Sequence, residues 1–348
     1  MLCKVSPVFA DMFTLPPSNV NESFEGSPVV RMPDGAEVLE QLLKILYQEA
    51  NLPLKRLDPN TPAQVGPLFE IAAKYEIDNV RSQIVQRLTE DWPTTLYKWD
   101  TLEAEIEAMN RDWHFQHKPC GGLSCPEYLD KYLPEPVSAI QLAKKHGVRS
   151  ILPAAFYHLS RLSIQWGPDG SERNEERQRM SRHRGVRTAK WKSLSAEDHY
   201  CLHVGRARLK AAVDSQIRGW TFSYHFGEGS DEDEDEPDDD PCSESARWKT
   251  RQDILEAVSN ADDVLHVLRR FTDVQCDELS DGLCSQCLLT FTTEARQLRR
   301  DLWGRLPEFF ELDLVRSQCS WSVGALANVW SLRLCSCSSP SARPGFYA

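Results

Sequence analysis

The sequence predicts a mainly α-helical protein in which charged linkers separate the helical segments. Apolar residues recur at the helical spacing i, i+3, i+4, i+7 in several segments. Capping residues and prolines mark where these segments begin. Two stretches, 172–192 and 227–245, are too charged and too poor in apolar residues to pack. The length of 348 residues suits about two domains, and 41% hydrophobic residues is ordinary for a globular protein.

The charge of the chain is concentrated in one short run. Nine of the ten residues from Asp231 to Asp240 are acidic, and they account for most of the formal net charge of -12. The N-terminus lacks the apolar core of a signal peptide, and no segment is apolar enough to span a membrane. The eleven cysteines, an odd number, then indicate reduced thiols. We therefore expect an intracellular protein, nuclear or cytoplasmic.

The first elements are a short helix, a strand and a second helix. Ser6 can cap a helix that places Phe9 and Phe13 on one face, and Pro28–Met32 reads as a strand. The run beginning at Asp34 reads as a capping box that opens the second helix. The apolar face of that helix comprises Leu39, Leu42, Leu43 and Leu46.

Two further helices follow as a pair. Thr61 is a capping residue followed by a proline and marks the start of the first helix. Asp78 caps the second helix, which ends before Pro93. The first apolar face comprises Leu68, Ile71, Ala72 and Tyr75, and the second comprises Val80, Ile84 and Leu88, with Ile77 at the corner between the helices. These periodic faces predict the core of the N-terminal part.

Residues 134–165 read as a second helical pair that resembles the first at an offset of 71 positions. Ile71, Ala72 and Ile77 align with Leu142, Ala143 and Val148, so the same helix-turn-helix unit is used twice. The alternative is that two amphipathic pairs resemble each other by chance. The repeat predicts that Ala143 is buried and that Lys144 faces solvent.

The remaining segments alternate between linkers and helices. We assign 94–133 as a linker that can hold a helix, 166–193 as a basic linker and 194–226 as a helical segment capped by Ser195. The acidic linker covers 227–246, and the C-terminal helical segment covers 247–312, with helices over Arg247–Phe271 and Thr293–Leu306. Segment 313–348 is an atypical tail, with no Asp, Glu or Lys from Leu314 onward.

Several phrases resemble a known family. Leu2–Phe13 (LCKVSPVFADMF), Pro28–Tyr47 and Pro67–Leu88 resemble parts of a BTB/POZ domain. More narrowly, four phrases resemble fungal BTB domain-containing proteins: Asp91–Pro93 (DWP), Tyr132–Pro136 (YLPEP), Ile151–Arg161 (ILPAAFYHLSR) and Leu306–Phe310 (LPEFF). The resemblance implies an incomplete α/β BTB-like domain over 1–93, followed by a helical extension.

The chain departs from that family at both ends. A complete BTB domain begins with a hairpin and a first helix, whereas Met1 here falls inside the domain. A strand over Val29–Met32 would then lack a sheet partner. We expect the true start of translation to lie upstream; the alternatives are that another chain supplies the missing strands or that the N-terminal third is poorly folded. The homodimer usual in the family depends on the missing segment. The composition of the tail, 313–348, resembles that of translated non-coding sequence.

Two groups of residues are candidates for metal binding. The first is His114, His117, Cys120 and Cys125, which are zinc-ligand types in one compact run. The alternative is a flexible linker that happens to contain them. The second is Cys276, Cys284 and Cys287; the last two lie one helical turn apart and equally suit small apolar residues against a core.

The function expected from the sequence is non-enzymatic. The chain has no nucleophile elbow, phosphate-binding loop, zinc-protease motif or dinucleotide fingerprint, so we predict neither catalytic residues nor a cofactor. The resemblance implies a protein–protein interaction module that assembles with itself or other proteins, or an adaptor for a cullin-type ubiquitin ligase. The alternative is a nuclear nucleic-acid or chromatin factor that uses the basic segment 173–192, although only Trp191 offers a ring that could stack on a base.

Overall fold

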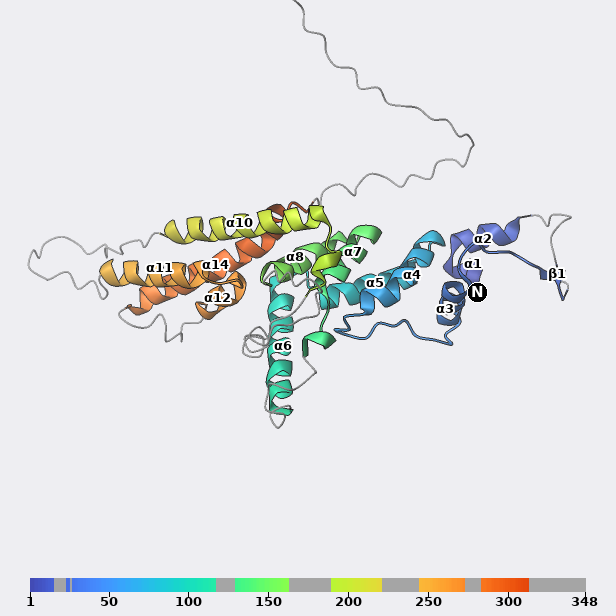
Figure 1. Cartoon of the computed structure of the whole chain (residues 1–348), viewed down its shortest axis with the longest axis horizontal. Helices are drawn as coiled ribbons and strands as arrows, with labels where there is room; N and C mark the ends of the chain where they lie inside the picture. Colours follow the sequence, from blue (N-terminus) through green and yellow to red (C-terminus); the bar gives the residue numbers. More distant parts are fainter. Residues whose placement is uncertain are drawn as a thin grey trace, which may run out of the picture. The chain divides into compact units, whose positions relative to one another are not determined.

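Helices make up nearly all of the regular structure (Figure 1). The computed structural model describes residues 1–15, 23–25, 27–116, 129–162, 189–220, 244–272 and 283–312, all within one compact unit, Met1–Leu314. The elements, with η marking 3-10 helices, are α1 (Leu2–Val5), α2 (Pro7–Thr14), β1 (Ser23–Phe24), β2 (Ser27–Pro28), α3 (Ala36–Leu46), α4 (Thr61–Lys74), α5 (Asp78–Asp91), α6 (Leu96–Gln116), η2 (Leu129–Tyr132), α7 (Pro136–His146), η3 (Arg149–Ile151), α8 (Leu152–Ser160), η4 (Trp191–Ser193), α10 (Ala196–Arg218), α11 (Glu244–Ser259), α12 (Val264–Arg270) and α14 (Ser285–Phe309).

The mainly α prediction is confirmed, and the strand prediction is wrong. β1 and β2 form a two-residue antiparallel hairpin in which Phe24 lies opposite Ser27. Only Pro28 of the predicted strand lies in it, and residues 29–32 have no regular structure. A strand persists only where a neighbour takes its backbone hydrogen bonds, and the described residues provide no sheet beyond this hairpin.

α2 is attached to α4 through one polar and one aromatic contact. The Ser6 hydroxyl caps α2 by accepting from the Phe9 backbone N–H at 3.1 Å, and it donates to the Tyr75 carbonyl at 2.5 Å. Phe9 stacks on the Tyr75 ring with centroids 4.7 Å apart. The prediction that Phe13 joins the core is wrong, because Phe13 is 49% exposed. α2 has only eight residues, and the one it buries is Phe9.

The predicted capping box at Asp34 is also wrong. The residue that precedes α3 is Gly35, and no side chain caps that helix. The Asp34 carboxylate instead binds Lys74 Nζ at 2.7 Å and the Tyr75 hydroxyl. The hydrogen bonds from Lys74 and then Tyr75 lower the pKa of Asp34. The Asp34 carboxylate thus binds the charged Lys74 ammonium, which tertiary packing brings close, instead of the backbone N–H groups at the start of α3.

α4 and α5 begin close to where the sequence places them. Thr61 and Asp78 are the first residues of these helices rather than their caps, which are Asn60 and Ile77. The predicted core is buried except at three positions, namely the exposed Phe13 and the half-buried Leu39 and Leu43. The buried positions are Phe9, Leu42, Leu46, Leu68, Ile71, Ala72, Tyr75, Ile77, Val80, Ile84 and Leu88.

The two helical pairs turn their corners in the same way. The Ile77 N–H donates to the Ala72 carbonyl at 2.8 Å, and the equivalent Val148 N–H donates to the Ala143 carbonyl at 2.9 Å. The residue before each of these donors is left-handed, with φ of 51° at Glu76 and 71° at Gly147. The aligned apolar residues are buried in both pairs: Ile71 and Leu142, Ala72 and Ala143, Ile77 and Val148, Val80 and Ile151, Ile84 and Ala155, Leu88 and Leu159. Helix α4 packs directly against α7, so the first pair lies against the second.

One part of the repeat prediction needs correction. Lys144 is exposed, as expected, but its ammonium pairs with the carboxylate of Asp198, whose side chain is buried. Lys144 is therefore not an inert surface position. The neighbouring Lys145 is more exposed, and among the described residues its ion-pair partner is the surface residue Glu70. It is the better control for a test of the buried face.

We expect Ala143→Leu to lower the free energy of unfolding by about 1–3 kcal/mol, because Ala143 has no exposed surface and lies where the chain turns the corner. Lys145→Leu should change it by no more than about 0.5–1 kcal/mol, the size of a surface ion-pair effect. Denaturant unfolding measures both. Equal losses from the two substitutions would contradict the assigned faces.

The C-terminal helices pack on the second pair. α8 contacts α10 and α14, while α10, α11 and α14 lie side by side, with α12 against α11 and α14 (Figure 1). The single helix predicted over Arg247–Phe271 is wrong, because it is broken between α11 and α12. Asp263 caps α12 by accepting from the His266 N–H at 3.0 Å. In the described part of the chain, no helix is long and apolar enough to cross a membrane.

Candidate functional site

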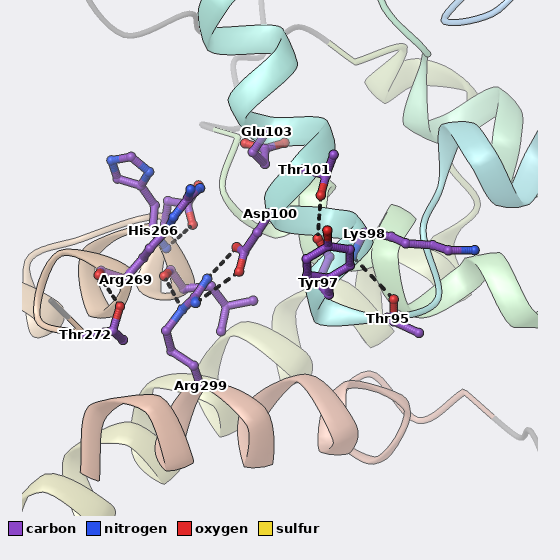
Figure 2. Close-up of polar contacts among 12 residues, drawn as sticks. Thr95, Tyr97, Lys98, Asp100, Thr101, Glu103, His266, Arg269, Thr272 and Arg299 are labelled. Atoms are coloured by element: carbon purple, nitrogen blue, oxygen red, sulfur yellow. Dashed lines mark hydrogen bonds and ion pairs between the residues drawn. The ribbon is translucent and has the colours of Figure 1, made fainter. Parts of the chain in front are cut away.

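A group of buried and half-buried charged residues lies where α6, α8, α12 and α14 meet. Asp100 and Glu103 lie on one face of α6 because they are three residues apart. We call this group the ion-pair junction, and its members are Asp100, Glu103, Arg161, Asp263 and Arg299. Figure 2 shows α14 presenting Arg299 to Asp100, with Glu103 one turn further along α6.

Arg161, the residue that ends α8, is the centre of the junction. Its guanidinium donates to both carboxylate oxygens of Glu103, at 2.6 and 2.8 Å, and also to Asp263. It lies over the Trp99 ring at 4.8 Å. Only 9% of its side chain is exposed. Burial opposes its charge, but Asp263 and Glu103 more than offset this and raise the pKa of Arg161.

His158 adds a neutral acceptor to the junction. Its Nδ1 lies 2.7 Å from an Arg161 nitrogen, and an arginine can only donate, so Nδ1 is the accepting atom. The ring is buried and lies edge-on to Trp92 at 5.8 Å. His158 and Arg161, three positions apart in the sequence, therefore contact each other.

Asp263 connects α12 to α8. Besides Arg161, its carboxylate accepts from the Tyr157 hydroxyl at 2.7 Å. Burial favours the neutral form of Asp263, yet Arg161 and these hydrogen bonds lower its pKa. The Tyr157 oxygen accepts in turn from the Leu265 N–H at 2.9 Å. Burial, followed by the charge of Asp263, raises the pKa of Tyr157.

Arg299 makes the second bridge of the junction. It donates to both oxygens of Asp100, at 2.6 and 3.1 Å, and its Nε donates to the Leu265 carbonyl at 2.9 Å. Arg299 is buried, and Asp100 is 199 positions away in the sequence. Each carboxylate of the junction is paired with a guanidinium, and Arg161 is shared by two of the three carboxylates, so the arrangement stabilises contacts between helices.

A separate buried carboxylate lies at the end of α5. Asp91 is 3% exposed and accepts from the Leu57 N–H at 3.1 Å. Burial raises its pKa to about 6, against the opposing effects of that hydrogen bond and of Arg87 and Arg56. The folded protein thus keeps a proton on Asp91 at a pH at which the unfolded chain has lost it. The resulting stabilisation is complete below pH 3.8 and is lost as the pH rises through about 6.

We therefore expect Asp91→Asn, which keeps the oxygen acceptor without the charge, to be more stable than the natural protein near neutral pH. The difference in free energy of unfolding should grow by about 2 kcal/mol between about pH 4.5 and about pH 7.5. Denaturant unfolding of both proteins at the two pH values measures it. A difference that does not change with pH would contradict the assignment.

The predicted metal groups lie only partly within the described residues. His114 lies in α6, whereas His117, Cys120, Cys125 and Cys276 lie outside the described residues. Cys284 caps α14, and Cys287 follows in its first turn. Within the described ranges, no three His, Cys, Asp or Glu side chains are grouped as metal ligands.

The alternative function, nucleic-acid binding, would use the basic segment 173–192. Of this segment, the structure describes only residues 189–192. Its Trp191 is 9% exposed and stacks on His199 with centroids 6.4 Å apart. The Lys190 N–H donates to Glu135 at 2.9 Å. At this end of the linker Lys190 and Lys192 are exposed, as expected, but Trp191, the ring that could stack on a base, is packed against the protein.

Sequence reasoning missed the junction, because its partners lie 58 to 199 positions apart and no local pattern links them. No protein-family model, curated protein or solved structure matches the chain.

Proposed function

We propose that the chain is a non-enzymatic protein–protein interaction module of the BTB/POZ type, whose N-terminal elements bind partners. The observation that carries this proposal is the exposure of large apolar side chains there. Phe24 is 70% exposed, Tyr47 is 50% exposed and Phe13 is 49% exposed; Leu15 and Val30 are exposed as well. Scattered exposed apolar residues are ordinary, but several in one short region are typical of interaction sites.

The packing of the N-terminal elements supports the same proposal. α2 contacts α4 through Phe9 and Tyr75, and α3 also packs on α4. Phe13 of α2 and Tyr47 at the end of α3 are therefore exposed aromatic residues on two helices that both pack on α4. We define the N-terminal apolar surface as Phe13, Leu15, Phe24, Val30 and Tyr47.

The rest of the unit supplies a firm support for that surface. α4 and α5 pack against the second helical pair, and α10 and α14 pack against α8. The ion-pair junction adds buried bridges to this contact. The resemblance to BTB proteins extends the proposal to a finer one, in which the partner is a second copy of the chain or a protein recruited to a cullin-type ubiquitin ligase.

The test compares two triple variants of the full chain. Phe13→Ser, Phe24→Ser and Tyr47→Ser remove the aromatic rings of the N-terminal apolar surface. The matched control removes three exposed aromatic rings elsewhere, with Tyr97→Ser, Phe115→Ser and Tyr200→Ser. Sedimentation velocity measures self-association, and quantitative affinity purification, including cullins, measures binding to other proteins.

We expect the first variant to lose at least about tenfold in self-association or in recovery of a specific partner, because interface aromatics carry much of the binding energy. The control should bind as the natural protein does. Equal binding by both variants would contradict the assigned surface. A folded natural chain that neither self-associates nor enriches any protein would contradict the proposal itself.

A further inference from the structure

Two thiols lie together at the beginning of α14. Cys284 is the cap of this 25-residue helix, and Cys287 is in its first turn. The Cys284 backbone is extended, with φ of -73° and ψ of 162°, which directs its side chain over that turn. Its Sγ accepts from the Cys287 N–H at 3.4 Å. The sulfur of one cysteine therefore lies beside the backbone of the other.

Both thiols lie outside the buried core. Each is half-buried, whereas Cys201 of α10 is buried. Burial raises the pKa of the Cys201 thiol, which makes that residue unreactive. The first fully buried residue of α14 is Phe291, one turn after Cys287. Cys284 and Cys287 therefore lie at the edge of the core and do not fill its interior.

We propose that Cys284 and Cys287 are a redox-sensitive dithiol that closes reversibly to a disulfide with low-molecular-weight disulfides such as glutathione disulfide. This inference does not depend on the proposed function. Residues three apart on a helix have β-carbons about 5–6 Å apart, and the capping conformation of Cys284 allows a closer approach. Disulfides require β-carbons about 3.5–4.5 Å apart, so the two β-carbons must approach each other by about 1–2 Å. Closure therefore needs a local adjustment of the first turn.

The chemistry is two successive thiol–disulfide exchanges. The Cys284 thiolate is stabilised by the N–H it accepts from and by the positive end of the helix, and it attacks one sulfur of glutathione disulfide. This forms a mixed disulfide and releases one glutathione thiolate. The Cys287 thiolate then attacks Cys284 Sγ and releases the second. The two electrons of the protein dithiol reduce glutathione disulfide, and its two protons end on the two glutathione molecules.

The test is a glutathione redox titration of the full chain. Samples are quenched with acid, the remaining thiols are alkylated, and the state of each cysteine is read by peptide mass spectrometry. We expect Cys284 and Cys287 to be oxidised together and joined to each other. Half-oxidation should need at least about tenfold less glutathione disulfide than modification of Cys3, a single exposed thiol. Dithiothreitol should restore both thiols.

Single substitutions separate the two roles. Cys287→Ser should accumulate glutathione on Cys284, because the thiol that resolves the mixed disulfide is gone. Cys284→Ser should leave Cys287 no more reactive than Cys3. Serine is a favoured cap, so α14 should still form in this variant. Cys201→Ser and Cys276→Ser should leave the titration unchanged.

Two results would overturn the proposal. One is oxidation of Cys284 at no lower a concentration than Cys3. The other is pairing of Cys284 with Cys276, or loss of the titration in the Cys276→Ser variant.

Discussion

Arg161→Met is expected to lower the free energy of unfolding by about 3–5 kcal/mol. Methionine keeps much of the length of the side chain but removes the positive charge that Glu103 and Asp263 share. Breaking a buried ion pair from one side leaves uncompensated charge in the interior, which is the costly part. Denaturant unfolding monitored by circular dichroism measures the loss.

The control for this substitution is Arg218→Met at the end of α10. Arg218 also binds a carboxylate with two nitrogens, that of Asp214 at 2.8 and 3.0 Å, but 61% of its side chain is exposed. Exposed pairs contribute at most about 1 kcal/mol. If both substitutions cost the same, burial of the junction is not what stabilises the protein.

Gly205→Ala is expected to destabilise the protein by about 3 kcal/mol. A β-carbon on Gly205 would lie 1.9 Å from Cδ1 of Phe310 and 2.3 Å from its Cε1. Phe310 has no exposed surface, and its ring lies 5.7 Å from that of Phe156, so it has little room to move away. Overpacking a filled core costs about 1–3 kcal/mol, and an overlap this deep belongs at the upper end. Thermal and denaturant unfolding both measure it.

A second helical glycine provides the matched comparison. Gly304 of α14 has open space where a β-carbon would be. Gly304→Ala should therefore stabilise the protein by up to about 1 kcal/mol, because alanine is the better helix former. Opposite signs at the two glycines are expected. Stabilisation at both would show that α10 does not approach Phe310 this closely.

Local periodicity was enough to predict most of the helices and the repeated corner. The apolar faces that end in Tyr75 and Leu88 follow from spacing alone, because a helix with one buried face must repeat apolar residues every three to four positions. The alignment of Ile77 with Val148 identified two corners with the same backbone hydrogen bond. The start at Ser195 was also readable, and its hydroxyl accepts from the Asp198 N–H at 3.0 Å.

The remaining features depend on partners that are distant in the sequence. Asp34 has the sequence pattern of a cap, but Lys74 and Tyr75 compete for its carboxylate once α4 has packed. The spacing from Phe9 to Phe13 is correct for a shared face, but burial depends on what lies opposite. Helix patterns likewise do not show that Asp100 reaches Arg299 across 199 positions. Spacing along the chain carries no information on such pairings.

The interaction energy between Asp100 and Arg299 tests most directly whether the ion-pair junction joins α6 to the C-terminal helices. It is obtained from a double-mutant cycle with Asp100→Asn, Arg299→Met and the two combined, in denaturant unfolding. Because Arg299 is buried and the pair is bidentate, with a shortest distance of 2.6 Å, we predict a coupling of at least about 1.5 kcal/mol. If the changes in free energy of unfolding of the two single substitutions add up to that of the double variant within about 0.5 kcal/mol, Asp100 and Arg299 do not join α6 to α14 in the way the ion-pair junction requires.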